Sequence, residues 1–377
     1  LPPQPVLAGD IDADVCILGA GYVGLSTALE LADAGYRVVV LEAERIGWGA
    51  SGRNGGQVLP GYGCGETKLA ALVGRDDARK LFDWSCEGMR LIHQRRTRYG
   101  IDCDWRAGHA IVAIKPRQIV ELQSWQRELE QDYGYPMTWW NREELCARLD
   151  SPRYLGGLHD ANAGHLHPLK YALGLGRAAL AAGVRIFEAS PVLRIARGAN
   201  PVLHTAQGTV RCDFAVLAGN ALVKGVAPEL DRKIMPVGTY IAATVPLGAE
   251  RAQSLIRNDM AIADTNWALD YFRLSSDHRL LFGGRASYSN FQPPNLDWVM
   301  TRRMRKVFPQ LADVGFEHLW GGTIDISLNR APHWGRIGSN VYFAQGFSGH
   351  GVAATNLAGG IVADAIRRQN ERLDVFA

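Results

Sequence analysis

The chain opens with short apolar runs separated by a segment of helical periodicity. Ala13–Leu18 is an apolar run that ends at a glycine, as buried strands of parallel sheets often do. Leu25–Ala34 repeats apolar residues at helical spacing and is followed by Gly35, a common residue just after a helix. Tyr36–Leu41 is a second apolar run. This order predicts a βαβ unit at the start of the chain.

The same alternation returns further along the chain. It predicts helices and buried strands at Leu169–Ala182, Val184–Glu188, Phe214–Ala218, Val341–Gln345 and Ala353–Arg368. The stretches between these segments follow another pattern. They predict helices at Asp76–Tyr99 and Pro116–Asp132, a strand at Ala107–Ile114, and antiparallel strands from about Pro236 to Trp320.

These patterns predict an α/β fold in which a doubly wound, Rossmann-like domain is interleaved with an α+β domain that has a mixed, largely antiparallel sheet. The 377 residues exceed the roughly 250–300 that one hydrophobic core normally serves, so two domains are expected. We assign residues 1–85, 150–222 and 328–377 to the first domain. Residues 86–149 and 223–327 form the second.

Composition narrows the possible partners. The formal net charge is +3 and no long basic run occurs, so we expect no nucleic-acid partner. The arginines within Arg90–Arg98 are predicted to lie on one solvated helix face. No apolar stretch reaches the ~20 residues that span a bilayer, so we expect no membrane partner. The six cysteines are scattered without a CxxC pair, which fits reduced thiols and a cytoplasmic protein. Nothing in the sequence indicates an oligomeric state.

The glycines after the first strand form a dinucleotide-binding pattern. Gly19, Gly21 and Gly24 stand in a GxGxxG arrangement between a predicted strand and a predicted helix. They allow a tight turn, a close backbone approach to a pyrophosphate, and close packing of helix on strand. Glu42 ends the second strand, where a carboxylate accepts hydrogen bonds from a ribose and disfavours NADP. The motif alone leaves FAD and NAD open.

Two further glycine-rich segments favour FAD. Gly47–Gly56 follows the glutamate strand, and Gly346–Gly351 follows the last predicted strand. A long dinucleotide needs close backbone approaches from distant parts of the chain, and glycine permits them. An NAD site would leave both segments without a role.

The chain resembles the D-amino-acid oxidase/glycine oxidase superfamily of FAD-dependent oxidoreductases, and within it the bacterial gamma-glutamylputrescine oxidases. The resemblance extends over nearly the whole chain. It is carried by the segments DADVCILGAGYVGLSTALELADAGYRVVVLEA, IGWGASGRNGGQ, GHLHPLKYA, VLAGNA, YFRLSSDHRLLFGG and FAQGFSGHGVAATNLAG.

The resemblance implies which residues bind FAD. The implied cofactor-binding residues are Gly19, Gly21, Tyr22, Val23, Gly24, Glu42, Ala43, Gly49, Ala50, Ser51, Arg53, Asn54, Gly55, Gly56, Gln57, Val192, Gly219, Asn220, Gly346, Phe347, Ser348, Gly349, His350, Gly351 and Val352.

Two departures from the related sarcosine oxidases change the expectation. Those enzymes attach FAD through a cysteine, but Trp320–Ile324 of this chain contains none. We therefore expect non-covalent FAD, which acid precipitation would release into the supernatant. They also carry a lysine for the substrate carboxylate, at the position of Ala353 in this chain. A substrate without a carboxylate beside the reacting amine fits better, such as a gamma-glutamylated polyamine.

The implied reaction is amine oxidation. A hydride leaves the carbon next to a neutral amine for flavin N5, the imine hydrolyses, and O₂ is reduced to H₂O₂. One alternative is a glycine, sarcosine or D-amino-acid oxidase, and another is a quinone-linked dehydrogenase. An alternative of another class is a flavoprotein subunit that docks a partner.

Four residues are candidates for the catalytic site. His350 lies in the glycine-rich turn and either contacts cofactor or substrate or holds the loop. Tyr271 and Arg273 lie on the same side of a predicted strand, and Arg273 either binds a remote glutamyl carboxylate or forms an ordinary salt bridge. Trp267 either walls the pocket or packs in the core. His165 and His167 have no evident third ligand, so no metal is expected.

Overall fold

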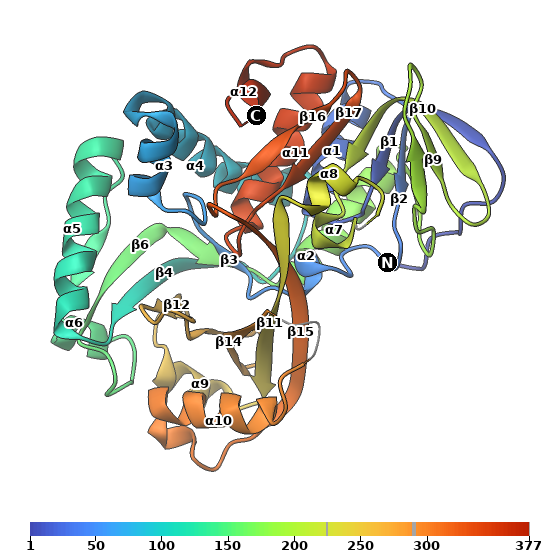
Figure 1. Ribbon diagram of the computed structural model, residues 1–377. Coiled ribbons are helices and arrows are strands. Elements are labelled where there is room, and N and C mark those ends of the chain that lie inside the picture. Colours follow the sequence, from blue (N-terminus) through green and yellow to red (C-terminus); the bar gives the residue numbers. More distant parts are fainter. Residues whose placement is uncertain (224, 289–291, 377) are drawn as a thin grey trace.

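The computed structural model describes residues 1–223, 225–288 and 292–376, and two sheets organise them (Figure 1). The first sheet has the strand order β16-β17-β10-β1-β2-β7, with β9 beside β10 and β8 beside β9. Its strands are β1 (Ile11–Leu18), β2 (Val38–Leu41), β7 (Arg185–Phe187), β8 (Arg194–Ala196), β9 (Val202–His204), β10 (Thr209–Leu217), β16 (His333–Ile337) and β17 (Val341–Gln345).

The second sheet has the order β15-β11-β14-β13-β12-β4-β6-β3, with β5 beside β6. Its pairs are antiparallel except β12 with β4. Its strands are β3 (Gln57–Val58), β4 (Arg106–Ala113), β5 (Thr138–Trp140), β6 (Gly156–His165), β11 (Ile234–Thr244), β12 (Ala261–Asp264), β13 (Tyr271–Leu274), β14 (Leu280–Ser287) and β15 (Phe316–Ser327).

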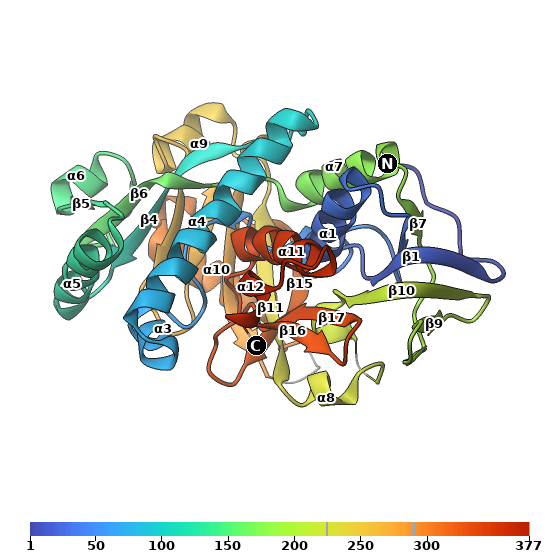
Figure 2. The same cartoon turned by 90° about the horizontal axis from the view of Figure 1, so that it is seen from above.

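Helices cover both sheets, and α11 lies between α1 and α4 when the molecule is seen from above (Figure 2). The helices are α1 (Tyr22–Asp33), α2 (Ala50–Arg53), α3 (Glu66–Val73), α4 (Arg75–Arg98), α5 (Pro116–Tyr133), α6 (Arg142–Cys146), α7 (Pro168–Ala181), α8 (Pro228–Asp231), α9 (Ala249–Leu255), α10 (Leu296–Val307), α11 (Val352–Ile366) and α12 (Glu371–Asp374), with short 3₁₀ turns η1 (Asn220–Leu222) and η2 (Pro309–Leu311). Within the described residues, no helix has both the length and the apolar character needed to cross a membrane.

The predicted α/β fold class and the opening βαβ unit are confirmed. Strands β1 and β2 are parallel neighbours, and α1 connects them. All four residues of β2 are buried, as expected for a strand covered on both faces. Helix α1 begins at Tyr22, directly after the glycine turn, and Gly21 is its N-cap residue.

Sheet membership differs from the predicted domain limits in two places. Strands β3 and β6 pair within the second sheet, although residues 1–85 and 150–222 were predicted to belong to the first domain. Strand β3 has only two residues and β6 is glycine-rich and weakly apolar, so the periodicity gave little signal for them. We propose that the second domain also takes in these two strands.

The prediction of strands alone between Pro236 and Trp320 was wrong, because α9 and α10 interrupt them. Helix α10 buries Leu296, Met300 and Met304 against the second sheet, at a spacing of four residues. Its exposed face carries arginine and lysine side chains. The helical period was therefore present in the sequence but was missed beside the flanking strand patterns.

Helix α4 joins the two parts of the molecule through a buried arginine. Arg95 is only 4% exposed, which corrects the prediction of one solvated arginine face. Its guanidinium donates to Ser26 Oγ at 2.9 Å and to Asn356 Oδ1 at 2.8 Å, and it pairs with Glu30 at 2.9 Å. Arg95 thus ties α4 to α1 and α11, the two helices that begin at the glycine-rich turns.

We predict that Arg95→Met lowers the free energy of unfolding by about 2–4 kcal/mol, because it leaves buried acceptors without their charged donor. Arg98→Met is the matched control, since the Arg98 side chain is 62% exposed in its 2.8 Å pair with Asp33. The control is expected to cost less than about 1 kcal/mol. Urea unfolding of both variants measures the difference, and equal losses would contradict the role assigned to Arg95.

Candidate functional site

The turn between β1 and α1 is built for close backbone approach. Gly19 has φ +100°, a conformation that favours glycine. A Cβ at Gly24 would collide with the carbonyl oxygen of Gly19, so only glycine lets α1 pack this closely. The positive dipole end of α1 therefore lies beside a cavity that Gly21, Tyr22 and Val23 line, an arrangement that binds phosphates.

Glu42 holds the same turn from the end of β2. Its carboxylate accepts hydrogen bonds from Ala20 N at 2.7 Å and from Glu44 N at 3.0 Å. Burial raises its pKa, and the two backbone donors oppose that rise. Glu42 lines a cavity, here called cavity A, together with Gly19, Val192 and Gly219. Cavity A therefore has a carboxylate beside the turn, as a ribose site requires.

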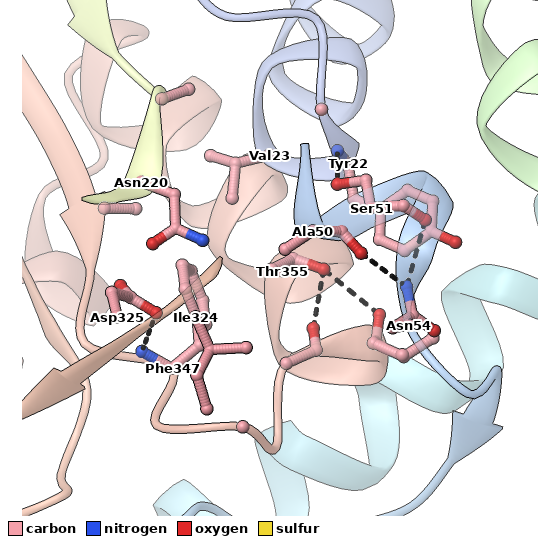
Figure 3. A pocket seen from close by; sticks show the side chains of 16 residues that line it. Tyr22, Val23, Ala50, Ser51, Asn54, Asn220, Ile324, Asp325, Phe347 and Thr355 are labelled. Carbon is pink, nitrogen blue, oxygen red and sulfur yellow. Dashed lines mark hydrogen bonds between the residues drawn. The ribbon is translucent and has the colours of Figure 1, made fainter. Parts of the chain in front are cut away.

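A second cavity, cavity B, continues from the N-terminus of α1 (Figure 3). Tyr22 N donates to Ser51 Oγ at 3.0 Å, which joins α1 to α2. Asn54 caps α2 by donating to the Ala50 and Ser51 carbonyl oxygens at 2.9 and 3.0 Å. The side chain of Val23 on α1 approaches the same space, as do those of Asn220, Ile324, Phe347 and Thr355 from other elements.

A third cavity, cavity C, has a volume of about 210 Å³ and lies between strands of the second sheet and the glycine-rich turn before α11. None of the residues that line it carries an acidic side chain or a lysine or arginine. They are Asn54, Gly55, Gln57, Leu59, His109, Thr239, Ala263, Leu269, Tyr271, Ile324, Gly349, His350, Gly351 and Val352.

His350 and Tyr271 supply polar atoms to cavity C. His350 Nε2 lies 2.7 Å from the carbonyl oxygen of Pro60, so Nε2 carries the proton and Nδ1 is left as an acceptor. Burial lowers the pKa of His350, which is therefore neutral at pH 7. Burial also raises the pKa of Tyr271, whose hydroxyl stays protonated. Both side chains are uncharged hydrogen-bonding groups.

His109 also lines cavity C and was missed by sequence reasoning. It is 1% exposed, and its Nε2 has no hydrogen-bond partner among the described residues. A bulge between Ala107 and His109 re-aims the side chain, with Gly108 at φ +96°. Burial lowers the pKa of His109 to about 3, so the ring is neutral. The signal in the sequence was the glycine beside it inside a predicted strand.

Asp325 on β15 was also missed, although it holds the glycine-rich turn before α11. Its carboxylate accepts hydrogen bonds from Gly346 N and from Phe347 N, the latter at 3.3 Å. Its carbonyl oxygen accepts one from Ser348 N at 2.9 Å. Burial raises the pKa of Asp325 to about 6, against the lowering effect of these donors. An acid between apolar residues in a strand was the available signal.

Cavities A, B and C form one path. A and B share Gly21, Ser51 and Asn220, and B and C share Asn54 and Val352 among others. The path begins at the carboxylate of Glu42, passes the N-terminus of α1 and reaches cavity C, where Nε2 of Gln57 and Nε2 of His109 have no hydrogen-bond partner among the described residues. A carboxylate followed by a phosphate-binding helix end is the order of groups that FAD requires, so the residues of cavities A and B fit FAD and cavity C is a further space at the far end of the path.

Most of the predicted cofactor-binding residues line this path. They are Gly19, Gly21, Tyr22, Val23, Glu42, Ala43, Gly49, Ala50, Ser51, Asn54, Gly55, Gln57, Val192, Gly219, Asn220, Phe347, Gly349, His350, Gly351 and Val352. Gly24, Gly56, Gly346 and Ser348 do not line it and shape the backbone beside it instead. Arg53 lines an adjacent cavity and stacks on Trp48 at 4.5 Å.

Two predicted catalytic residues lie elsewhere. Trp267 is 90% exposed, because Asp264 closes its loop by accepting from Asn266 N and Asp270 N, and the tip points to solvent. The prediction that Trp267 walls the pocket or packs in the core was wrong. Arg273 lines a separate polar cavity, cavity D, instead of cavity C. It forms no salt bridge with a described residue.

Ala353, the position at which the related sarcosine oxidases carry a lysine, does not itself line cavity B or C. Ala353 is buried against α4, where a Cβ on Gly88 would press on its carbonyl oxygen. The residue of α11 that faces cavities B and C is Val352, because successive helix positions point in different directions. Val352 is as uncharged as Ala353, so the expected lack of a cation at this point stands.

His165 and His167 point to different partners. His165 Nε2 lies 2.7 Å from the carbonyl oxygen of Asp259, and His167 Nδ1 accepts from Lys170 N at 3.4 Å. His167 also lines cavity D. Neither histidine lies beside a group of three or more potential metal ligands within the part of the chain that the structure describes.

Comparison with known protein families gives a match over most of the chain. Residues 14–365 match the model of the DAO family, described as FAD dependent oxidoreductase. The chain is 45% identical to "Probable oxidoreductase OrdL" of Haemophilus influenzae, over 97% of this chain and 85% of that protein. It is 40% identical to "Gamma-glutamylputrescine oxidoreductase" of Escherichia coli K12, over 100% of this chain and 88% of that protein.

Solved structures show the same fold. Glycine oxidase from Geobacillus kaustophilus superposes with a TM-score of 0.79 at 21% identity, with 95% of both chains covered. L-proline dehydrogenase from P. horikoshii superposes with a TM-score of 0.80 at 19% identity, over 100% of this chain and 96% of that chain.

We predict that Asp325 makes stability depend on pH. Its pKa in the folded protein is raised, so the native state holds a proton there that the unfolded chain releases, and stability falls as pH rises toward 6 and beyond. Between pH 5 and 7.5 the wild type should lose about 1–1.5 kcal/mol relative to Asp325→Asn, whose side chain does not titrate. Urea unfolding at both pH values measures this, and a constant difference between the two proteins would refute it.

Proposed function

This chain belongs to the DAO family of FAD-dependent oxidoreductases, and we propose that it is an amine oxidase whose substrate has no carboxylate next to the reacting amine. The substrate class we propose is a gamma-glutamylated polyamine or a related amine. The oxidised amine is an imine, which water hydrolyses to an aldehyde and ammonia. We propose non-covalent FAD, with O₂ as the electron acceptor and H₂O₂ as its product.

The observation that carries this proposal is the uncharged lining of cavity C. An α-amino acid in the cavity would need a cation for its carboxylate, since burying an unpaired charge is costly. No lysine or arginine lines the cavity, and Val352 occupies the helix position that faces it. The same lining disfavours an ammonium ion, because no carboxylate is present to pair with it. The cavity therefore suits a neutral amine.

The chain's own residues bind and orient that amine. The Nδ1 of His350 is an acceptor for an amine N–H group and the unpartnered Nε2 of His109 is a second hydrogen-bonding atom for the amine, while Leu59, Ile324 and Val352 exclude water. Desolvation by these apolar groups keeps the amine uncharged, which leaves its nitrogen lone pair available. FAD supplies the acceptor for the hydride of the adjacent C–H bond.

The relatives support the substrate class. The 40% identical protein of Escherichia coli is named a gamma-glutamylputrescine oxidoreductase, and the match spans all of this chain. A gamma-glutamyl amine carries its carboxylate far from the reacting nitrogen, as the uncharged cavity requires. All six cysteines are free in the structure, which fits the proposed cytoplasmic location.

The test is flavin reduction in the holoprotein without oxygen, followed by a peroxide assay in air. The panel is γ-glutamylputrescine, putrescine, glycine, sarcosine and a D-amino acid. We expect reduction by the first compound, weaker or no reduction by the three α-amino acids, and H₂O₂ on readmission of air. Turnover with α-amino acids alone would overturn the substrate class. Reduction without peroxide formation would point to the quinone-linked alternative.

We predict that His109→Leu weakens substrate binding about tenfold, the effect of one lost hydrogen bond, while FAD content is unchanged. His109→Gln is the matched control, because its side chain can place a polar atom near the position of Nε2. Affinity for γ-glutamylputrescine is measured from flavin reduction at a series of substrate concentrations. If the leucine variant binds as tightly as the wild type, His109 does not contact the substrate.

A further inference from the structure

We propose that cavity D binds a small organic carboxylate and that the guanidinium of Arg273 is its anchor. Cavity D has a volume of about 790 Å³. It is lined by the end of α2, the start of α7 and strands β13, β14 and β15, and it shares only Asn54 with cavity C. It is therefore a separate space on another side of the α2 segment.

The other ionised groups in the wall of cavity D are already paired. Lys170 lies 2.8 Å from Asp104, which also accepts from Ser276 Oγ at 2.9 Å. Arg279 pairs with Asp277 at 2.6 Å and with Glu317. Each of these two cations and three carboxylates therefore has a partner of opposite charge, and none of the three carboxylates forms an ion pair with Arg273.

Arg273 differs from them. It is 4% exposed on β13, and its guanidinium donates only to backbone oxygens, from Nε to Gly55 at 2.6 Å and from Nη1 to Leu274 at 2.9 Å. Within the described residues, no carboxylate lies at ion-pair distance from it. Burial lowers the pKa of Arg273 to about 10, so the side chain is still cationic at pH 7.

An anion is the partner that this arrangement lacks. These two hydrogen bonds use two of the five N–H donors of the guanidinium, and no described residue accepts from the other three, which leaves them for a ligand in the cavity. Because the guanidinium is planar and its Nε and Nη1 donate to backbone carbonyl oxygens, its orientation is fixed. The free N–H groups of a fixed, planar guanidinium match the two oxygens of a carboxylate better than they match a spherical anion.

The carboxylate has two possible sources. One is the glutamyl end of the amine substrate, and this version rests on the proposed function. The other is a separate small carboxylate that binds whether or not an amine is oxidised. Both share the chemistry that Arg273 recognises, and the experiment distinguishes them.

The experiment titrates the oxidised holoprotein with glutarate by calorimetry, without turnover. Leu281 lies directly opposite Arg273 in the β13·β14 register and lines the same cavity. Leu281→Glu places a carboxylate within cross-strand reach of Arg273, so it should occupy the guanidinium and weaken glutarate binding more than about tenfold. Leu281→Gln has the same size as Leu281→Glu but no charge. This variant should bind glutarate within about threefold of wild type, because the ion pairs in the wall of cavity D stay unchanged.

Arg273→Met is the second variant and should also lose glutarate binding. Failure of wild type to bind glutarate would overturn the proposal, as would equal affinity in the two Leu281 variants or retained affinity in Arg273→Met.

Steady-state assays then identify the source of the carboxylate. If Leu281→Glu raises KM for γ-glutamylputrescine but not for putrescine, the glutamyl end occupies cavity D. If neither KM changes, a separate carboxylate does, and either result supports the site. If no amine reduces the flavin while glutarate still binds, the proposed function fails and the carboxylate site stands.

Discussion

The arrangement of the site depends on how the short segment at residues 50–56 is held. It is held by hydrogen bonds from helix α1 and from two strands of the second sheet. Tyr22 N binds Ser51 Oγ, Trp320 Nε1 donates to the Arg53 carbonyl oxygen at 3.0 Å, and Arg273 Nε donates to that of Gly55. Because a glycine-rich segment has little side-chain packing of its own, these three bonds define its path. Every cavity of the site has part of this segment in its wall.

The segment also separates two chemical environments. Cavity C on one side contains neutral imidazoles, a protonated phenol and apolar side chains. Cavity D on the other contains ionised groups, of which Arg273 alone lacks a charged partner among the described residues. An uncharged environment favours the neutral form of an amine, and an uncompensated guanidinium favours a carboxylate. A molecule that carries both groups at a distance, or two separate molecules, would satisfy the pair of cavities.

Local patterns predicted the elements next to the cofactor path well. Val341–Gln345 was predicted as a strand and is β17 with the same bounds, because an apolar run followed by glycine has few alternatives. Helix α10 was missed although Leu296, Met300 and Met304 repeat at helical spacing, because strand patterns on both sides dominated. Arg95 was placed on a solvated face, since periodicity cannot show that this one arginine of α4 is covered by α1 and α11.

The sequence by itself determined the family, the dinucleotide turn and the lack of a cation at the start of α11. These features depend on residue type at fixed spacing, such as Gly19, Gly21 and Gly24, so they are readable along the chain. Only the tertiary structure decided that His109 lines cavity C, that Asp325 holds the second glycine turn and that Arg273 faces another cavity than Tyr271. A bulge, a contact between distant strands and the side of a loop that a side chain reaches are long-range outcomes of packing. No local pattern encodes them.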